Sequence, residues 1–252
     1  MVLPIGDDNR DRRITPIVNY LLIIGNILAF IFWQDWGRDL NVSFAYSAIP
    51  AEILTNEDVV TNSKILVDPL TGQQVELPGL QRTPIPVFLT LFTSMFMHGG
   101  LAHLGGNMLF LWIFGDNIED ALGHMRYLIF YLLCGMLAGL SHVFSTLLLD
   151  QNLLIPSLGA SGAISAVLGA YIMLYPTRTV HVWIFFIFIL PVPALIVVGL
   201  WFVFQVLNGL GTLGGEEASG IAYAAHIGGF IVGFLLIRLF TPKRVAISSR
   251  RR

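Results

Sequence analysis

Two side chains, Ser161 and His226, have the residue types needed for nucleophilic attack on an acyl group. A serine hydroxyl is a weak nucleophile until an adjacent base takes its proton, and neutral histidine is the usual base. Ser161 stands in Gly159-Ala160-Ser161-Gly162, where small neighbours leave the hydroxyl reachable. His226 stands in the similar setting Ala225-His226-Ile227-Gly228-Gly229. The two form a nucleophile and its base if the fold brings them within about 2.6 to 3.2 Å.

A second group of polar side chains lies in another apolar stretch and comprises His98, His103 and Asn107. His103 and Asn107 are four residues apart, so in a helix they share one face at a height difference of about 6 Å. That face can present two hydrogen-bond donors. Four glycines nearby have no side chain and so permit close approach of another backbone: Gly99, Gly100, Gly105 and Gly106.

The composition places these residues in a membrane protein. Of 252 residues, 55% are hydrophobic and 12% are charged, whereas soluble domains carry about 25% charged residues. A crossing helix needs about 20 mostly apolar residues. We predict an all-α fold with six transmembrane helices, at residues 15–33, 87–114, 125–148, 159–175, 193–210 and 221–240.

Lysine and arginine gather on one side of these predicted helices, and such loops stay on the cytoplasmic side. If both termini are cytoplasmic, eleven of the 14 lysine and arginine residues lie on the cytoplasmic side, and three lie outside: Arg38, Lys64 and Arg82. We therefore predict an N-in, C-in topology for a six-span domain over residues 15–240. Tails at 1–14 and 241–252 are cytoplasmic, and 34–86 forms a large external loop. In that loop, Pro50 begins a short helix and residues 68–72 form a hairpin turn.

Two further apolar stretches need an assignment. Residues 17–33 follow three arginines but are long for a signal peptide and have no small-residue cleavage site after them, so they are predicted to be the first span. The run 181–192 ends in two prolines, Pro191 and Pro193, and is predicted to be an interfacial lead-in to the fifth span.

The predicted topology brings the polar side chains to one depth. The second, fourth and sixth spans run from outside to inside, so His103, Asn107, Ser161 and His226 all lie near the external surface. Ser161, Ser165 and Gly169 give the fourth span a smooth face, and Ala225, Gly229 and Gly233 do so for the sixth. Two such faces pack closely, as a serine-histidine hydrogen bond requires.

These motifs together resemble the rhomboid family of intramembrane serine proteases, bacterial type, over roughly residues 86 to 233. The resemblance rests on His98, His103 and Asn107, on Glu119-Asp120-Ala121-Leu122-Gly123, and on the Ser161 and His226 motifs above. It implies a catalytic dyad of Ser161 and His226. It also implies an oxyanion hole of His103, Asn107 and the Ser161 backbone N–H, with His98 as a supporting residue.

The resemblance further implies a substrate. This would be a single-pass transmembrane protein that enters between the second and fifth spans, where Trp201, Phe202 and Phe204 would line the gate. Residues 211–220 hold four glycines and are predicted to form a flexible lid. Ser165 stands where the best-known bacterial members carry a tyrosine that stacks on the catalytic histidine, so another group must orient His226. Their Trp-Arg pair in the first external loop is also missing.

Other functions predict different features of the sequence. Taken singly, Ser161 is more typical of helix packing, and His226 is as consistent with an interhelical hydrogen bond as with catalysis. A non-catalytic rhomboid-like protein that binds membrane helices is the alternative, and it would be expected to have lost one of the two. A transporter should show inverted repeats. No His-Glu-x-x-His motif or intramembrane carboxylate completes a metal site, no cofactor is expected, and no basic stripe favours nucleic acid.

The expected environment is the lipid bilayer of a prokaryotic plasma membrane, because the apolar spans are unbroken and the sequence shows no transit peptide. The active site would then lie near the external face. The other histidines have no predicted partner, and Glu119 is expected to pair with Arg126 in a cytoplasmic turn.

Overall fold

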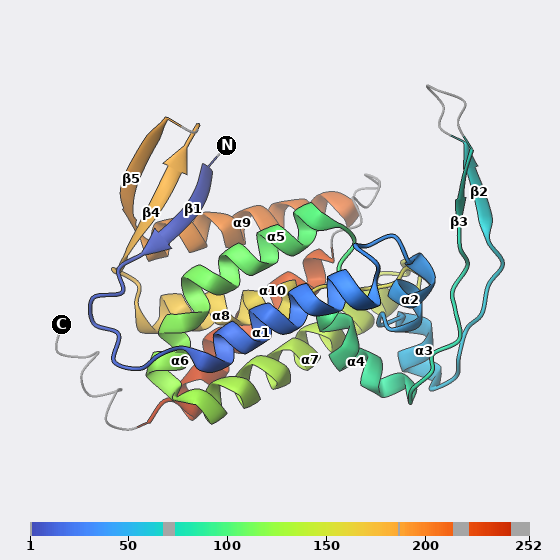
Figure 1. The fold of residues 1–252 in the computed structure, drawn as a ribbon, viewed down its shortest axis with the longest axis horizontal. Coiled ribbons are helices and arrows are strands. Elements are labelled where there is room, and N and C mark those ends of the chain that lie inside the picture. The colour runs from blue at the N-terminus through green and yellow to red at the C-terminus, as the bar shows by residue number, and fades with distance from the viewer. Residues whose placement is uncertain (1, 68–73, 186, 214–221, 243–252) are drawn as a thin grey trace.

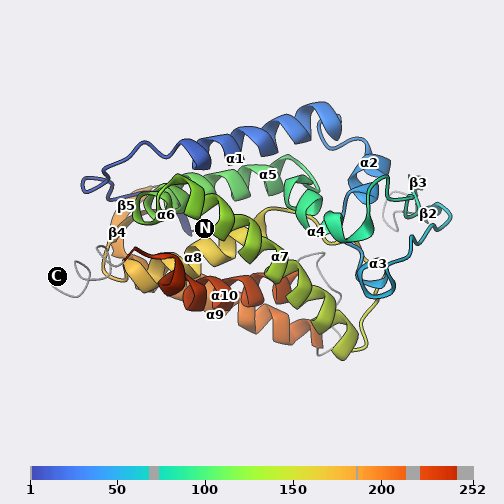
Figure 2. The ribbon, with the colours of Figure 1, turned by 90° about the horizontal axis from the view of Figure 1, so that it is seen from below.

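The computed structural model describes residues 2–67, 74–185, 187–213 and 222–242. Most of this chain is helical, and long helices lie side by side around α8 (Figures 1 and 2). The helices are α1 (Ile17–Leu28) continuing into the π-helix η1 (Ala29–Trp33), α2 (Leu40–Ala45), α3 (Pro50–Thr55), the short run η2 (Val87–Leu89), α4 (Thr90–Thr93) and η3 (Ser94–Phe96), the run α5 (Leu101–Phe110), η4 (Leu111–Gly115) and α6 (Asp116–Leu122), α7 (His124–Leu148), α8 (Ser161–Leu174), α9 (Ala194–Leu213) and α10 (Tyr223–Phe240).

The outer surface of this bundle suits a bilayer. Large apolar side chains are exposed along the helices, among them Leu200, Leu235 and Leu239, whereas soluble proteins rarely expose extended apolar patches. Among the described residues, three helices have the length and hydropathy to cross: His124–Leu148, Ala194–Gly211 and Tyr223–Phe240. If the bent pair Val87–Phe96 and Leu101–Leu122 is counted as one crossing, the number of candidate crossings rises to four. Two further apolar helices are shorter, Ile17–Trp33 and Ser161–Leu174. The chain is an integral membrane protein, and six crossings stay a prediction.

The predicted second span is wrong as one continuous helix over 87–114. Val87–Phe96 and Leu101–Leu122 meet at an angle of 83°, because Met97 is extended and Gly99 and Gly100 follow it. Only proline has a lower helix propensity than glycine. His98 therefore lies in the bend, and α5 begins at Leu101.

Helices α8 and α10 pack at backbone distance, as their small residues predicted. A Cβ placed at Gly233 would lie 2.0 Å from the Ala166 carbonyl oxygen, and one at Gly229 would lie 2.3 Å from the Gly162 oxygen. No residue larger than glycine fits either position without moving a backbone. This contact fixes how Ser161, at the start of α8, lies relative to α10.

The all-α prediction is wrong in one respect, since the described residues also form two small sheets. Strands β1 (Val2–Asp7), β4 (Thr179–Ile184) and β5 (Phe188–Pro193) form an antiparallel sheet with β4 in the centre. It replaces the interfacial lead-in predicted for 181–192, and its prolines are tolerated because β5 is an edge strand. The predicted hairpin in the long loop is confirmed as β2 (Lys64–Val67) paired with β3 (Gln74–Leu77), and α3 confirms the helix at Pro50. The turn residues 68–73 lie outside the described chain.

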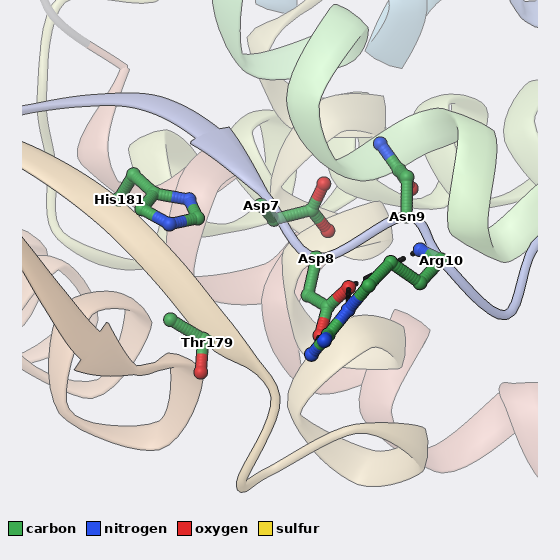
Figure 3. A pocket seen from close by; sticks show the side chains of 6 residues that line it. All are labelled: Asp7, Asp8, Asn9, Arg10, Thr179 and His181. Carbon is green, nitrogen blue, oxygen red and sulfur yellow. Dashed lines mark hydrogen bonds and ion pairs between the residues drawn. The ribbon is translucent and has the colours of Figure 1, made fainter.

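Strand β1 is held to the helices beside it by partly buried polar contacts. Asp7 accepts hydrogen bonds from the Tyr171 hydroxyl of α8 and, at 2.8 Å, from the Asn117 amide of α6. Asp7 also borders a surface pocket of about 540 Å³ (Figure 3), in which Asp8 and Arg10 form an ion pair of 2.6 Å. Because β4 follows the C-terminal end of α8, this pocket lies at the end of α8 opposite to Ser161.

Glu119 also has a different role from the one predicted. Its fully buried carboxylate accepts from the backbone N–H groups of Val18 and Asn19 at the start of α1 and contacts the His124 ring. The N–H groups at a helix start lack partners within the helix. The predicted pairing of Glu119 with Arg126 is therefore wrong, and His124 does have a partner.

The α8–α10 contact predicts a large penalty for one added methyl group. Gly233→Ala should lower the midpoint of thermal unfolding in detergent, because overpacking a close contact costs about 1 to 3 kcal/mol. Gly199→Ala in α9 is the matched control, since its new Cβ meets no atom within 4 Å. Equal midpoints for the two variants would contradict the described packing.

Asp7 predicts a pH-dependent stability. Burial, reinforced by the nearby Asp116 carboxylate, raises the pKa of Asp7 from 3.8 to about 7. The protonated form then favours the folded state, so its contribution is complete below about pH 4 and is lost as the pH rises to about 7. The unfolding midpoint of Asp7→Asn relative to the parent protein should therefore increase between pH 5 and pH 8.

Asp8→Asn is the control for this measurement. Hydrogen bonds from Arg10 hold the pKa of Asp8 below its usual range, so Asp8 stays ionised from pH 5 to pH 8. The difference between this variant and the parent should not change over that range. The same pH dependence in both variants would refute the assignment to Asp7.

Candidate active site

The starts of α8 and α10 bring Ser161 and His226 into direct contact. The Ser161 Oγ lies 2.7 Å from the His226 Nε2. Ser161 is the first residue of α8 and His226 the fourth of α10. The predicted geometry of a hydroxyl beside an imidazole is therefore present, within the range in which a proton can pass from one to the other.

His103 and Asn107 of α5 lie beside the backbone that leads to Ser161. A Cβ placed at Gly159 would be 2.8 Å from the His103 Nε2 and 3.6 Å from the Asn107 Nδ2. Gly159 has a φ of +118°, which an L side chain rarely adopts, and its N–H donates to the Ser94 carbonyl at 2.8 Å. Glycine thus lets two polar side chains reach the turn before Ser161.

The hydrogen bonds of the His103 ring indicate which nitrogen carries its proton. The Gly99 N–H donates to the His103 Nδ1 at 3.3 Å, so a neutral ring carries its hydrogen on Nε2. Nε2 is the nitrogen that faces Gly159. Within the described residues, the buried Asn107 Nδ2 has no hydrogen-bond acceptor. Two donors therefore point to the same region beside Ser161.

His98 contacts this group through His103. Its ring is 1% exposed and packs edge-on to the His103 ring at 5.2 Å. The backbone of His98 is held by Gln34, whose Oε1 accepts from the His98 N–H and whose Nε2 donates to the His98 carbonyl, both at 2.9 Å. Gln34 could not be identified as a site residue from the sequence, because it stands at the start of a polar loop, where glutamine is an ordinary residue.

The other nitrogen of His226 meets helix α9. The His226 Nδ1 lies 2.8 Å from the Oε1 of Gln205, which is 6% exposed. Trp201, one turn earlier in α9, has its ring centroid 6.1 Å from that of His226. Ser165 does not face the ring in this way, since its hydroxyl donates to the Ser161 carbonyl of its own helix at 2.6 Å. Both of these contacts with the His226 ring come from α9.

The residues predicted to line a gate in α9 separate into two kinds. The Trp201 and Phe202 rings pack against Phe230 of α10, the latter at 4.1 Å between centroids. Phe204 is 58% exposed on the outer surface. Of the predicted lid, 211–213 belong to α9 and 214–220 lie outside the described residues.

The arrangement suits acyl transfer. It combines a hydroxyl, a base in contact with it and two donors on the adjacent backbone turn, which are the parts needed to form a tetrahedral intermediate and hold its charge. Among the residues that the structure describes, no group of three His, Cys, Asp or Glu side chains lies close enough together to hold a metal ion.

Comparison with known proteins agrees with the resemblance seen in the motifs. Residues 86–243 match the family model described as the Rhomboid domain. Among similar proteins are Rhomboid protein 1, mitochondrial, of Saccharomyces cerevisiae (32% identical, over 69% of this chain and 47% of the relative) and Rhomboid protease GluP of Bacillus subtilis (34%, over 64% and 28%). The mouse Presenilin-associated rhomboid-like protein, mitochondrial, is 30% identical over 64% of this chain and 43% of its own. The chain thus matches less than half the length of each.

Proposed function

The chain belongs to the rhomboid family, and on that premise we propose that it is an intramembrane serine endopeptidase with Ser161 as nucleophile and His226 as general base. The observation that carries this proposal is the 2.7 Å distance between the Ser161 Oγ and the His226 Nε2. The Ser161 hydroxyl thus meets a base on another helix, whereas the Ser165 hydroxyl bonds to a carbonyl of its own helix. One relative, from Bacillus subtilis, bears the name of a protease.

The first half of the proposed reaction forms an acyl-enzyme. The Ser161 Oγ attacks the scissile carbonyl carbon while its proton passes to the His226 Nε2. The carbonyl oxygen becomes an oxyanion, which accepts hydrogen bonds from the His103 Nε2–H, the Asn107 amide and the Ser161 backbone N–H. That N–H is the first of its helix and has no partner four residues earlier. Positioned donors of this kind stabilise the transition state.

The second half returns the enzyme to its starting state. The protonated His226 gives its proton to the leaving amine, and the C–N bond breaks. Water then attacks the ester on Ser161, and His226 takes a proton from that water and returns it to the serine. His98 contributes by packing on the ring of His103.

We place the substrate in the bilayer, as a transmembrane protein cut in or near its spanning segment. The proposed topology has six spans over residues 15–240, cytoplasmic tails at 1–14 and 241–252, and the site near the external face. Entry between α5 and α9 follows from the resemblance. Similar proteins include mitochondrial members as well as a bacterial one, so a prokaryotic plasma membrane stays a prediction.

The direct test is cleavage of a model transmembrane substrate in liposomes. The parent protein should cleave, and Ser161→Ala and His226→Ala should lose about three or more orders of magnitude in kcat. A fluorophosphonate should label the parent protein and spare Ser161→Ala. If the parent protein neither cleaves nor is labelled, the chain is a non-catalytic member that binds membrane helices, and this proposal is wrong.

The oxyanion role of Asn107 has its own test. Asn107→Ala should reduce kcat by about 10²- to 10³-fold, the usual loss for one donor, with little change in KM and in the unfolding midpoint. The exposed Asn41→Ala of α2 is the control and should retain full activity. An undiminished kcat in Asn107→Ala would show that its amide does not contact the oxyanion.

A further inference from the structure

We propose that Gln205 is a positioning residue that fixes the tautomer and orientation of His226, a role that the resemblance gives to a stacking tyrosine at the position of Ser165. This inference rests on the proposed function. It starts from the two contacts of the His226 ring, with the Ser161 Oγ at 2.7 Å on Nε2 and the Gln205 Oε1 at 2.8 Å on Nδ1. The ring is therefore held at both nitrogens, from two different helices.

The chemistry of the base requires an acceptor at Nδ1. A neutral imidazole carries one hydrogen, and a base that accepts the serine proton at Nε2 must carry that hydrogen on Nδ1. If Nδ1–H had no acceptor, a buried donor would be left unpaired at a cost of about 1 to 3 kcal/mol. The carbonyl oxygen of Gln205 supplies the acceptor and selects the catalytically useful tautomer.

The same contact stabilises the ring once it is protonated. After proton transfer both nitrogens of His226 carry hydrogens, and the Gln205 carbonyl dipole points its negative end at the Nδ1–H. Hydrogen bonds to charged groups are worth more than those between neutral groups. A carboxylate would do this more strongly, but an uncharged amide costs less to bury among apolar helices.

The surroundings of Gln205 fit a positioning role. Gln205 and Trp201 are one turn apart in α9, so they share the face that meets α10, and both contact His226. Phe202 stacks on Phe230 and holds α9 against α10 nearby. Neither Ser165, engaged with its own helix, nor any residue of α10 makes these contacts with the ring in the described chain. The orientation of His226 thus depends on where α9 lies.

The test removes and then restores the acceptor. Gln205→Met keeps the length of the side chain without a hydrogen-bond acceptor of comparable strength, and should lower kcat about 10- to 100-fold with KM within twofold. Gln205→Glu restores an acceptor and should recover most of the activity. Asn208→Leu is the control, because the Asn208 amide donates to the Phe204 carbonyl of its own helix, and it should cleave like the parent protein.

The pH profile separates positioning from a structural role. The acid limb of the kcat profile should move to lower pH in Gln205→Met and to higher pH in Gln205→Glu, because the amide and the carboxylate stabilise protonated His226 to different degrees. Unchanged kcat in Gln205→Met, or a loss of kcat in both variants without any shift of the profile, would overturn the inference. Failure of the proposed function differs, since the parent protein itself would then not cleave.

Discussion

The hydrogen bond between Ser161 and His226 depends on an unusually close approach of two helices. Its 2.7 Å length holds because α8 and α10 touch at backbone level, with Gly229 and Gly233 against the carbonyls of Gly162 and Ala166. In a bilayer, helix association gains little from burying apolar surface, so small residues that permit close packing carry much of the specificity. The packing that folds these helices is thus also what aligns the reacting atoms.

Around this contact, several polar groups buried among apolar helices are held by a further polar side chain. Gln34 holds the backbone of His98, and Gln205 holds the far side of the His226 ring. At the other end of the bundle, the Asn19 amide donates to the Leu111 carbonyl at the start of the π-helix η4, and the Tyr127 hydroxyl donates to Asn19 at 2.7 Å. A π-helical turn leaves backbone groups that such an insertion can satisfy. Buried polar groups stabilise a fold when they are paired in this way.

Sequence reasoning predicted the meeting of His103, Asn107, Ser161 and His226 because helix direction and small-residue spacing are periodic features. It missed the bend at 97–100, where one extended residue before two glycines interrupts an apolar run. It also missed β4 and β5, since a short apolar run does not distinguish a strand from a helix. The partner strand of β1 lies more than 170 residues away along the chain, and no local sequence pattern predicts such a pairing.

For Gln205, the sequence indicates an unusual residue but not the side chain that it contacts. A glutamine in an apolar span is visible from the sequence as an anomaly. Its partner is not visible, because the rotation of α9 about its own axis follows from packing with α10 and not from residue spacing. Ser165 cannot stack on the His226 ring as a tyrosine would, so the sequence indicates that another group holds the ring. The position of α9 shows that this group is Gln205, with Trp201 beside it.

The measurement that tests the central claim most directly is the protonation of the His226 ring in the resting protein. ¹⁵N NMR of histidine-labelled protein in lipid, with the signal assigned through His226→Ala, reports each nitrogen separately. The account predicts hydrogen on Nδ1, bonded to Gln205, and an unprotonated Nε2 that accepts from Ser161. Hydrogen on Nε2 would contradict it, because the ring could not then take the proton of the serine.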